Sequence, residues 1–246
     1  MIETAYLEIG EGLHLAYRHR SGRGPTLVFL PGYMSDMEGG KATALDAWAG
    51  AEGRAMLRFD YAGCGASDGD FEAQSLENWR NDVLAMIDDV VEGPVVLVGS
   101  SMGGWLMLLA ALARPGRVAG LVGIAAAPDF TSWGFSQEEK MAILRDGRIE
   151  RPSDYGEQPY VTKRAFWQSR ESLRLLHAPI AVDCPVRLLH SQADADVPWT
   201  YSLELMKQLR SADVQAIFVK DGDHRLSRAQ DIALLIATVK ALLEAL

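Results

Sequence analysis

The chain contains few cysteines, no long apolar segment and no excess of basic residues. Neither Cys64 nor Cys184 belongs to a Cys-x-x-Cys or Cys/His cluster, so the sequence indicates neither a disulfide framework nor a metal site. No apolar run reaches the roughly 18 residues that a transmembrane helix needs, so we expect no membrane span. The first residues lack a basic stretch followed by an apolar one, and we therefore expect no signal peptide and a cytoplasmic protein with reduced thiols.

The charge balance is acidic, with 33 acidic against 24 basic residues and a formal net charge of −9. Nucleic acids and anionic membranes require a basic face, so neither is expected as a main partner. The length of 246 residues is enough for one large α/β domain with a sizeable core. We predict a single domain over residues 1–246.

Short apolar runs alternate with helical patterns along the chain. A continuous apolar run, which is typical of a buried strand, occurs at residues 26–30, and further strands are predicted at residues 55–59, 95–98, 121–126, 185–190 and 214–219. Helical patterns stand between or after them, at residues 39–52, 75–91, 102–113, about 200–210 and about 228–245. Residues 3–9 and 12–18 carry alternating patterns that predict an N-terminal hairpin. The alternation predicts a parallel sheet with helices on both faces.

Residues 128–180 interrupt this alternation. They contain two helical patches, around 136–146 and 162–176. An insertion of this size on a compact sheet is typical of a lid over a binding site. The alternative is a packed decoration with no part in binding.

The segment Gly99-Ser100-Ser101-Met102-Gly103 fits the pattern G-x-S-x-G and lies between a predicted strand and a predicted helix. A sharp strand-to-helix turn forces its central residue toward strained backbone angles, and glycines on either side relieve the crowding. The Ser101 hydroxyl would then project at the start of a helix, where free N–H groups favour negative charge. Ser101 is therefore the predicted nucleophile and Ser100 a packed neighbour, although a plain tight turn is the alternative.

A serine hydroxyl is a weak nucleophile and needs a base. Of the five histidines, His224 lies in a polar loop after the last predicted strand, and such loops converge at one edge of a parallel sheet. The base in turn needs a carboxylate that fixes its tautomer. Asp194 and Asp196 both follow the penultimate strand, which ends at His190, and either could serve.

A tetrahedral intermediate needs two hydrogen-bond donors for its oxyanion. One is the backbone N–H of Met102, directly after Ser101. The other is expected from the loop that follows the strand at 26–30, where Tyr33 is the first candidate and Met34 the second.

The stretch FDYAGCGASDG, residues 59–69, resembles the D-x-x-G-x-G-x-S loop of α/β hydrolases. The order serine, aspartate, histidine along the chain is also that of this superfamily. The resemblance runs from about residue 13 to the C-terminus and implies an α/β-hydrolase fold with a mostly parallel eight-stranded sheet. It places the acid three residues before Val-Pro, which favours Asp194 over Asp196. It implies no cofactor.

Six phrases are similar to a narrower branch, that of the mitochondrial acyl-protein thioesterases, also described as acyl-glucuronide esterases: FLPGYMSDM, RFDYAGCGASDGDF, GSSMGGWLMLLAA, CPVRLLH, DVPW and DHRLS. The branch implies cleavage of acyl thioesters or carboxylic esters through an acyl-enzyme on Ser101. Small acyl esters or thioesters, and acylated proteins, are the implied partners. The residues themselves predict only acyl transfer to water. A peptidase, a carbon–carbon bond hydrolase and a non-catalytic binding protein of the same fold are the alternatives.

The insertion at 128–180 contains many large apolar side chains that are compatible with an acyl group. Trp133 and Phe135 lie just past the predicted strand end at Ala126, closer in sequence to the catalytic edge than Phe166 or Trp167. We predict that Trp133 and Phe135 help to bind the acyl group. The alternative is that these side chains form the insertion's own core.

Overall fold

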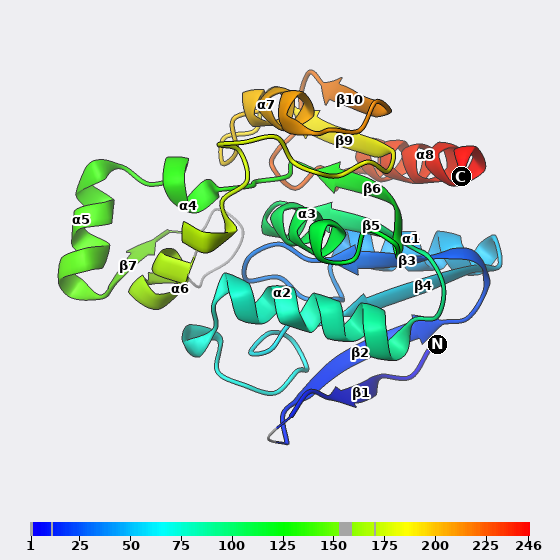
Figure 1. Ribbon diagram of the computed structural model, residues 1–246, viewed down its shortest axis with the longest axis horizontal. Coiled ribbons are helices and arrows are strands. Elements are labelled where there is room, and N and C mark those ends of the chain that lie inside the picture. Colours follow the sequence, from blue (N-terminus) through cyan, green and yellow to red (C-terminus); the bar gives the residue numbers. More distant parts are fainter. Residues whose placement is uncertain (1, 11, 153–158, 170) are drawn as a thin grey trace.

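The alternating pattern forms one eight-stranded sheet in a computed structural model that describes residues 2–10, 12–152, 159–169 and 171–246 (Figure 1). The strand order is β1-β2-β4-β3-β5-β6-β9-β10. The strands are β1 (Ala5–Glu8), β2 (His14–Arg20), β3 (Arg23–Leu30), β4 (Arg54–Phe59), β5 (Val95–Ser100), β6 (Val118–Ile124), β9 (Val186–Ser191) and β10 (Val214–Val219). Strand β2 pairs antiparallel with β1 and β4, and the remaining pairs are parallel. The predicted mostly parallel, eight-stranded sheet is confirmed.

Helices cover both faces of the sheet, because its central strands are apolar on both sides. They are α1 (Gly40–Ala51), α2 (Leu76–Ala85), α3 (Met102–Ala113), α7 (Thr200–Gln208) and α8 (Ala229–Ala245), with a π-helical turn at Met86–Val90 and a 3-10 turn at Phe71–Ala73. Side chains of α2, α3 and α7 share one buried cluster with the sheet, and those of α1 and α8 share another. The helices lie on the two faces of the sheet (Figure 1). Among the described residues, no helix combines the length and the apolar character that crossing a membrane requires.

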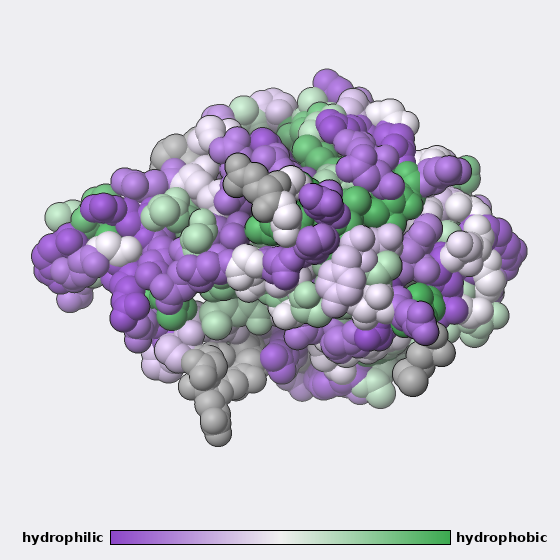
Figure 2. Space-filling model, turned by 90° about the horizontal axis from the view of Figure 1, so that it is seen from below, coloured by the Kyte–Doolittle hydropathy of each residue, from purple (hydrophilic) through white to green (hydrophobic). Residues whose placement is uncertain are grey.

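The segment at residues 128–180, called here the insertion, lies between β6 and β9. Its elements are α4 (Phe130–Trp133), α5 (Gln137–Asp146), β7 (Arg148–Arg151), β8 (Tyr160–Lys163), α6 (Arg164–Ser169) and a 3-10 turn at Glu171–Leu173. Strands β7 and β8 form an antiparallel hairpin, and the insertion projects beyond the end of the sheet (Figure 1). It stands out as a lobe on a mostly hydrophilic face (Figure 2).

The structure corrects the prediction of a helical patch at 162–176. The α-helical part spans only Arg164–Ser169, and the residues before it form strand β8. Tyr160, Val161 and Thr162 are aromatic or β-branched, which suits a strand that has a partner to pair with. That partner strand, β7, was not predicted from the sequence.

Candidate active site

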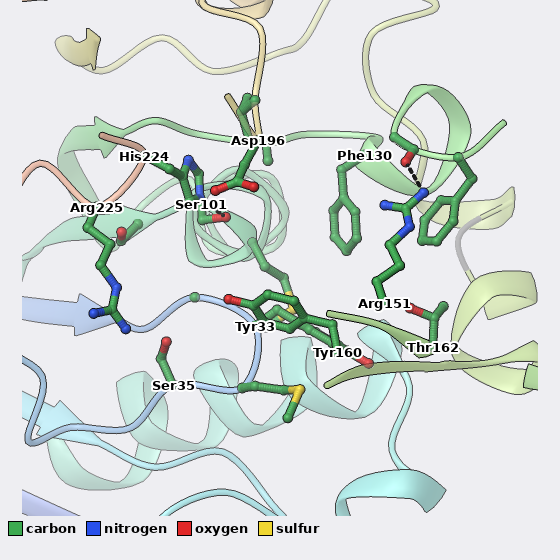
Figure 3. A pocket seen from close by; sticks show the side chains of 18 of the residues that line it. Tyr33, Ser35, Ser101, Phe130, Arg151, Tyr160, Thr162, Asp196, His224 and Arg225 are labelled. Carbon is green, nitrogen blue, oxygen red and sulfur yellow. Dashed lines mark hydrogen bonds between the residues drawn. The ribbon is translucent and has the colours of Figure 1, made fainter. Parts of the chain in front are cut away.

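Ser101 stands at the turn between β5 and α3, with φ 54° and ψ −118°. A positive φ is strained for a residue with a side chain, and such strain is typical of functional turns. The close approach around the turn requires glycine, because a Cβ on Gly103 would lie 2.1 Å from the Leu30 carbonyl oxygen and one on Gly99 would lie 2.4 Å from the Gly103 oxygen. The turn therefore holds the Ser101 hydroxyl above the carboxyl edge of the sheet (Figure 3).

The structure brings Ser101, His224 and Asp194 together from three separate loops. His224 Nε2 lies 3.0 Å from Ser101 Oγ, and its Nδ1 lies 2.8 Å from Asp194 Oδ2. A carboxylate oxygen only accepts, so Nδ1 carries the proton and the Nε2 lone pair of the neutral ring faces the serine. This is the geometry that a general base needs. The catalytic roles of these residues stay a prediction.

The carboxylate of Asp194 is fully buried and has four hydrogen-bond donors around it. Oδ1 accepts from the backbone N–H groups of Asp196 and Val197, each at 2.9 Å, and Oδ2 faces both His224 and His190. Burial by itself would raise the pKa of Asp194, but the hydrogen bonds from His190 and His224 outweigh it and hold that pKa well below its usual range. Asp194 is therefore an anion beside His224. Asp196, the other candidate, lines the pocket instead.

The loop after β3 approaches Ser101 closely. A Cβ placed on Gly32 would lie 3.4 Å from the Cβ of Ser101, so the loop lies in van der Waals contact with the turn. Tyr33 follows Gly32, and Met102 is the first residue of α3, where a backbone N–H has no partner inside the helix. Both residues line the same pocket as Ser101. Their roles as oxyanion donors stay a prediction.

Ser101 opens into a cavity of about 360 Å³ whose two sides differ in chemistry. The insertion contributes the aromatic residues Phe130, Trp133, Phe135 and Tyr160 together with Arg151 and Thr162, and the rest of the lining includes the polar or charged residues Ser35, Lys41, Asp196 and Arg225. Ser101 lies between Phe130 on one side and Ser35 with Arg225 on the other (Figure 3). Burial and the nearby Arg225 lower the pKa of Lys41 to about 8.

The two predicted pocket residues, Trp133 and Phe135, both line this cavity. Trp133 stacks on Tyr201 with ring centroids 4.0 Å apart. Phe135 also packs with Ile143 and Trp167 in the insertion's own small core, so its ring serves the fold as well as the pocket. Tyr160 of β8 also lines the cavity, although the sequence pattern around it predicts no strand and does not point to the pocket.

Comparison with known proteins gives one consistent result. The profile described as "Alpha/beta hydrolase family" matches residues 27–237. Human "Palmitoyl-protein thioesterase ABHD10, mitochondrial" is 44% identical over 95% of this chain and 78% of its own length. The solved structure "Alpha/beta hydrolase domain-containing protein 10 from mouse" superposes with a TM-score of 0.93 at 42% identity, covering 99% of each chain. A putative hydrolase from Agrobacterium vitis S4 also has a TM-score of 0.93, with 36% identity and 99% of each chain covered.

The expectation of a cytoplasmic protein is wrong by this comparison, because the human, mouse and bovine relatives are all named mitochondrial. The features behind that expectation were two unclustered cysteines, the lack of a long apolar run and the lack of a secretory pattern. These features do not identify a compartment.

The predicted resemblance to acyl-protein thioesterases is confirmed by the names of these relatives, and with it the expectation of a hydrolase for thioesters or esters. The fold, the matched profile and the identity to the relatives lead to the same assignment. The chain belongs to the alpha/beta hydrolase family.

Proposed function

We propose that residues 1–246 form one catalytic domain that cleaves acyl thioesters or carboxylic esters through an acyl-enzyme on Ser101. The main support for this proposal is the series of direct hydrogen bonds between Ser101 Oγ and His224, at 3.0 Å, and between His224 and Asp194, at 2.8 Å. In this proposal the insertion is the lid that forms the acyl side of the cavity. Neither a metal nor a cofactor takes part in the reaction.

The first half of the reaction forms the acyl-enzyme. His224 Nε2 takes the proton of the Ser101 hydroxyl as Oγ attacks the carbonyl carbon, and the carbonyl oxygen becomes an oxyanion facing the N–H groups of Tyr33 and Met102. The ionised Asp194 stabilises the resulting imidazolium. When the intermediate collapses, His224 returns the proton to the leaving sulfur or oxygen, and the carbonyl carbon stays bonded to Ser101 Oγ.

The second half releases the acid. Water gives a proton to His224 Nε2 and attacks the acyl carbon, and a second oxyanion forms at the same two N–H groups. Collapse of this intermediate breaks the bond to Oγ, and the proton from His224 restores the Ser101 hydroxyl. Each step needs one base and one oxyanion site, and the same groups serve both.

The two sides of the cavity suggest how a substrate lies in it. The aromatic residues Phe130, Trp133 and Tyr160 suit the acyl chain, since each buried CH₂ contributes roughly 0.8 kcal/mol. The leaving group must lie within reach of His224, on the side that carries Lys41 and Arg225. The relatives are named palmitoyl-protein thioesterases, which supports an acyl chain on a protein cysteine as one substrate.

A fluorophosphonate probe and a substrate panel test the proposal. Wild type and Ser100→Ala should become labelled, and Ser101→Ala should not, because the probe reacts with an activated serine. A panel of thioesters and oxygen esters with acyl chains of increasing length then defines the preferred bond and chain. A protein that binds acyl compounds but neither becomes labelled nor turns over any of them would be the non-catalytic alternative.

A further inference from the structure

The proposed reaction gives no part to His190, although this side chain touches the acid. His190 lies near the end of β9 and is 0% exposed. Its Nε2 lies 3.1 Å from Asp194 Oδ2 and 3.0 Å from the Val197 carbonyl oxygen, and its Nδ1 lies 2.7 Å from Ser202 Oγ. All polar atoms of the ring are therefore in hydrogen-bond contact with the loop that carries the acid or with α7.

These contacts fix where the ring proton sits. The Val197 carbonyl and the Asp194 carboxylate can only accept, so Nε2 is the protonated nitrogen. In the uncharged ring Nδ1 is then the acceptor of the Ser202 hydroxyl. Ser202 lies in the first turn of α7, so a helix sets the direction in which His190 points.

We propose that His190 is a positioning residue that acts through Asp194, holding Oδ2 in the orientation that His224 requires. The inference rests on the proposed function, because it assigns His190 a role only if Asp194 orients His224. A continuous series of hydrogen bonds results, from Ser202 through His190, Asp194 and His224 to Ser101.

The second histidine has a distinct task because the two carboxylate oxygens are held differently. Oδ1 accepts from two backbone N–H groups of its own loop, at Asp196 and Val197, which fix its place. Oδ2 has His224, which changes its charge during the reaction, and His190, which is buried and set by α7. His190 therefore supplies the constant partner of the oxygen that serves the base.

The competing explanation is that His190 is a core histidine whose hydrogen bonds only stabilise the loop at 192–199. Stability and positioning predict different behaviour when Asp194 is already changed. A residue that acts through Asp194 has nothing left to orient once the carboxylate is an amide. A residue that only stabilises the fold would have the same effect in either background.

The experiment is a double-mutant cycle measured by steady-state kinetics on one thioester, with the variants His190→Phe, Asp194→Asn and the pair. Phenylalanine keeps the size of the ring and removes its donor. His190→Phe alone should lower kcat about tenfold or more with KM unchanged, the usual effect of losing a hydrogen bond to a charged group. In the Asp194→Asn background it should cause no further loss. His190→Gln, whose amide N–H₂ can still donate to Asp194, should recover most of kcat.

An unchanged kcat in His190→Phe, or an equal loss of kcat in both backgrounds, would overturn the proposal. If His190→Phe fails to fold, Ser202→Ala provides the same cycle, because it removes the hydroxyl that sets the ring. Its smaller loss of kcat should again vanish in Asp194→Asn, and an additive loss would overturn the proposal. Failure of the proposed function looks different. In that case wild type would show no turnover, or a turnover that Ser101→Ala leaves unchanged.

Discussion

The carboxyl edge of the sheet and the insertion are built on different principles. At the sheet edge, Ser101, Asp194 and His224 lie in the three loops that follow β5, β9 and β10 and are joined by direct hydrogen bonds. The sheet beneath them belongs to one large buried core. The insertion has a core of its own with only three buried side chains among the described residues, which are Phe135, Ile143 and Trp167. The proposed chemistry thus rests on the large core, and the proposed substrate selection rests on a small core together with the insertion side chains that pack into the large one.

Buried packing of Phe166, Leu173 and Ile180 into the large core joins the insertion to the rest of the molecule, and hydrogen bonds from a few side chains add to it. The Trp105 indole donates to the Leu173 carbonyl at 3.0 Å, and the Tyr33 hydroxyl donates to the Val161 carbonyl at 2.5 Å. Bonds of this kind contribute about 1 kcal/mol each. Changes at the sheet edge should therefore remove activity, and changes in the insertion should alter affinity or stability by smaller amounts.

The largest effect is expected for the nucleophile at the sheet edge. Ser101→Ala should lower kcat about 10⁴-fold or more, because no other hydroxyl stands in its place at the turn. The neighbouring Ser100→Ala is the matched control and should keep most of the activity. The measurement is kcat on one thioester together with labelling by a fluorophosphonate. Comparable losses in the two variants would show that the wrong serine has been chosen.

A smaller but still large loss is expected for the acid. Asp194→Asn should lower kcat by about 10³- to 10⁴-fold, because an amide in this place favours the wrong imidazole tautomer. Asp196→Asn should lower it far less, since the Asp196 side chain lines the pocket and its loop contact to Asp194 is made by the backbone N–H. A greater loss in Asp196→Asn than in Asp194→Asn would exchange their roles.

The same contrast explains what the sequence could and could not predict. The site depends on local patterns, since a strained turn needs small neighbours at Gly99 and Gly103 and since Asp194 and His224 must follow the last strands of the sheet. These requirements can be recognised in the sequence from the order and spacing of residues. The parallel sheet and the proximity of Ser101, His224 and Asp194 could accordingly be predicted before any contact was known, and the catalytic roles of the three residues stay a prediction.

The structure of the insertion cannot be recognised in this way from the order and spacing of its residues. Its apolar side chains face a small core, the pocket or solvent, so their spacing follows no single periodicity. Tyr160–Lys163 becomes a strand only because β7 pairs with it. The contact of His190 with Ser202, which lies 12 residues further along the chain, likewise depends on how α7 packs on the sheet. Tertiary contacts, which have no local pattern, decided both.

The aromatic side of the cavity tests whether the insertion selects the acyl chain. Trp133→Ala should raise KM for long acyl chains about 10- to 100-fold and leave KM for acetyl substrates nearly unchanged, as expected for losing most of an aromatic wall. Phe135→Ala should show the same trend together with a lower Tm, because its ring is also core. The measurement is a KM series over chain length alongside melting curves.

Leu144→Ala is the matched control for these variants. Leu144 belongs to α5 of the insertion and is 41% exposed, so its loss should change neither the KM series nor Tm appreciably. Equal effects of Trp133→Ala on acetyl and long-chain substrates would refute the pocket assignment. The insertion would then be packed structure without a part in selection.

A direct link between the two regions is the Tyr33 hydroxyl. Tyr33→Phe keeps the backbone N–H beside Ser101 and removes the bond to Val161, so the free energy of unfolding should fall by about 1 kcal/mol. For a chain of this length Tm should fall by about 2 to 4 °C. The value of kcat on an acetyl thioester should stay unchanged. A large loss of kcat would show that the oxyanion loop depends on the insertion, and Tyr6→Phe, at an exposed site on β1, is the control.

The smallest effect is expected for an ion pair inside the insertion. Arg151 donates to Glu139 at 2.7 Å, and this hydrogen bond is the main cause that lowers the pKa of Glu139 from 4.5 to about 2. A lowered carboxylate pKa means that the pair stabilises the insertion above pH 4.5 and that this contribution is lost as the pH falls through about 2. Both side chains are partly exposed, so the effect should be slight.

Glu139→Gln isolates the charge, because glutamine can still accept from the Ser136 N–H in the capping box. Amide exchange in α5 should be slightly faster in Glu139→Gln than in wild type at pH 7, and this difference should become smaller as the pH falls below 4.5 toward about 2. A difference that stays the same over this pH range would mean that Glu139 titrates as an ordinary carboxyl and that Arg151 does not hold the insertion together.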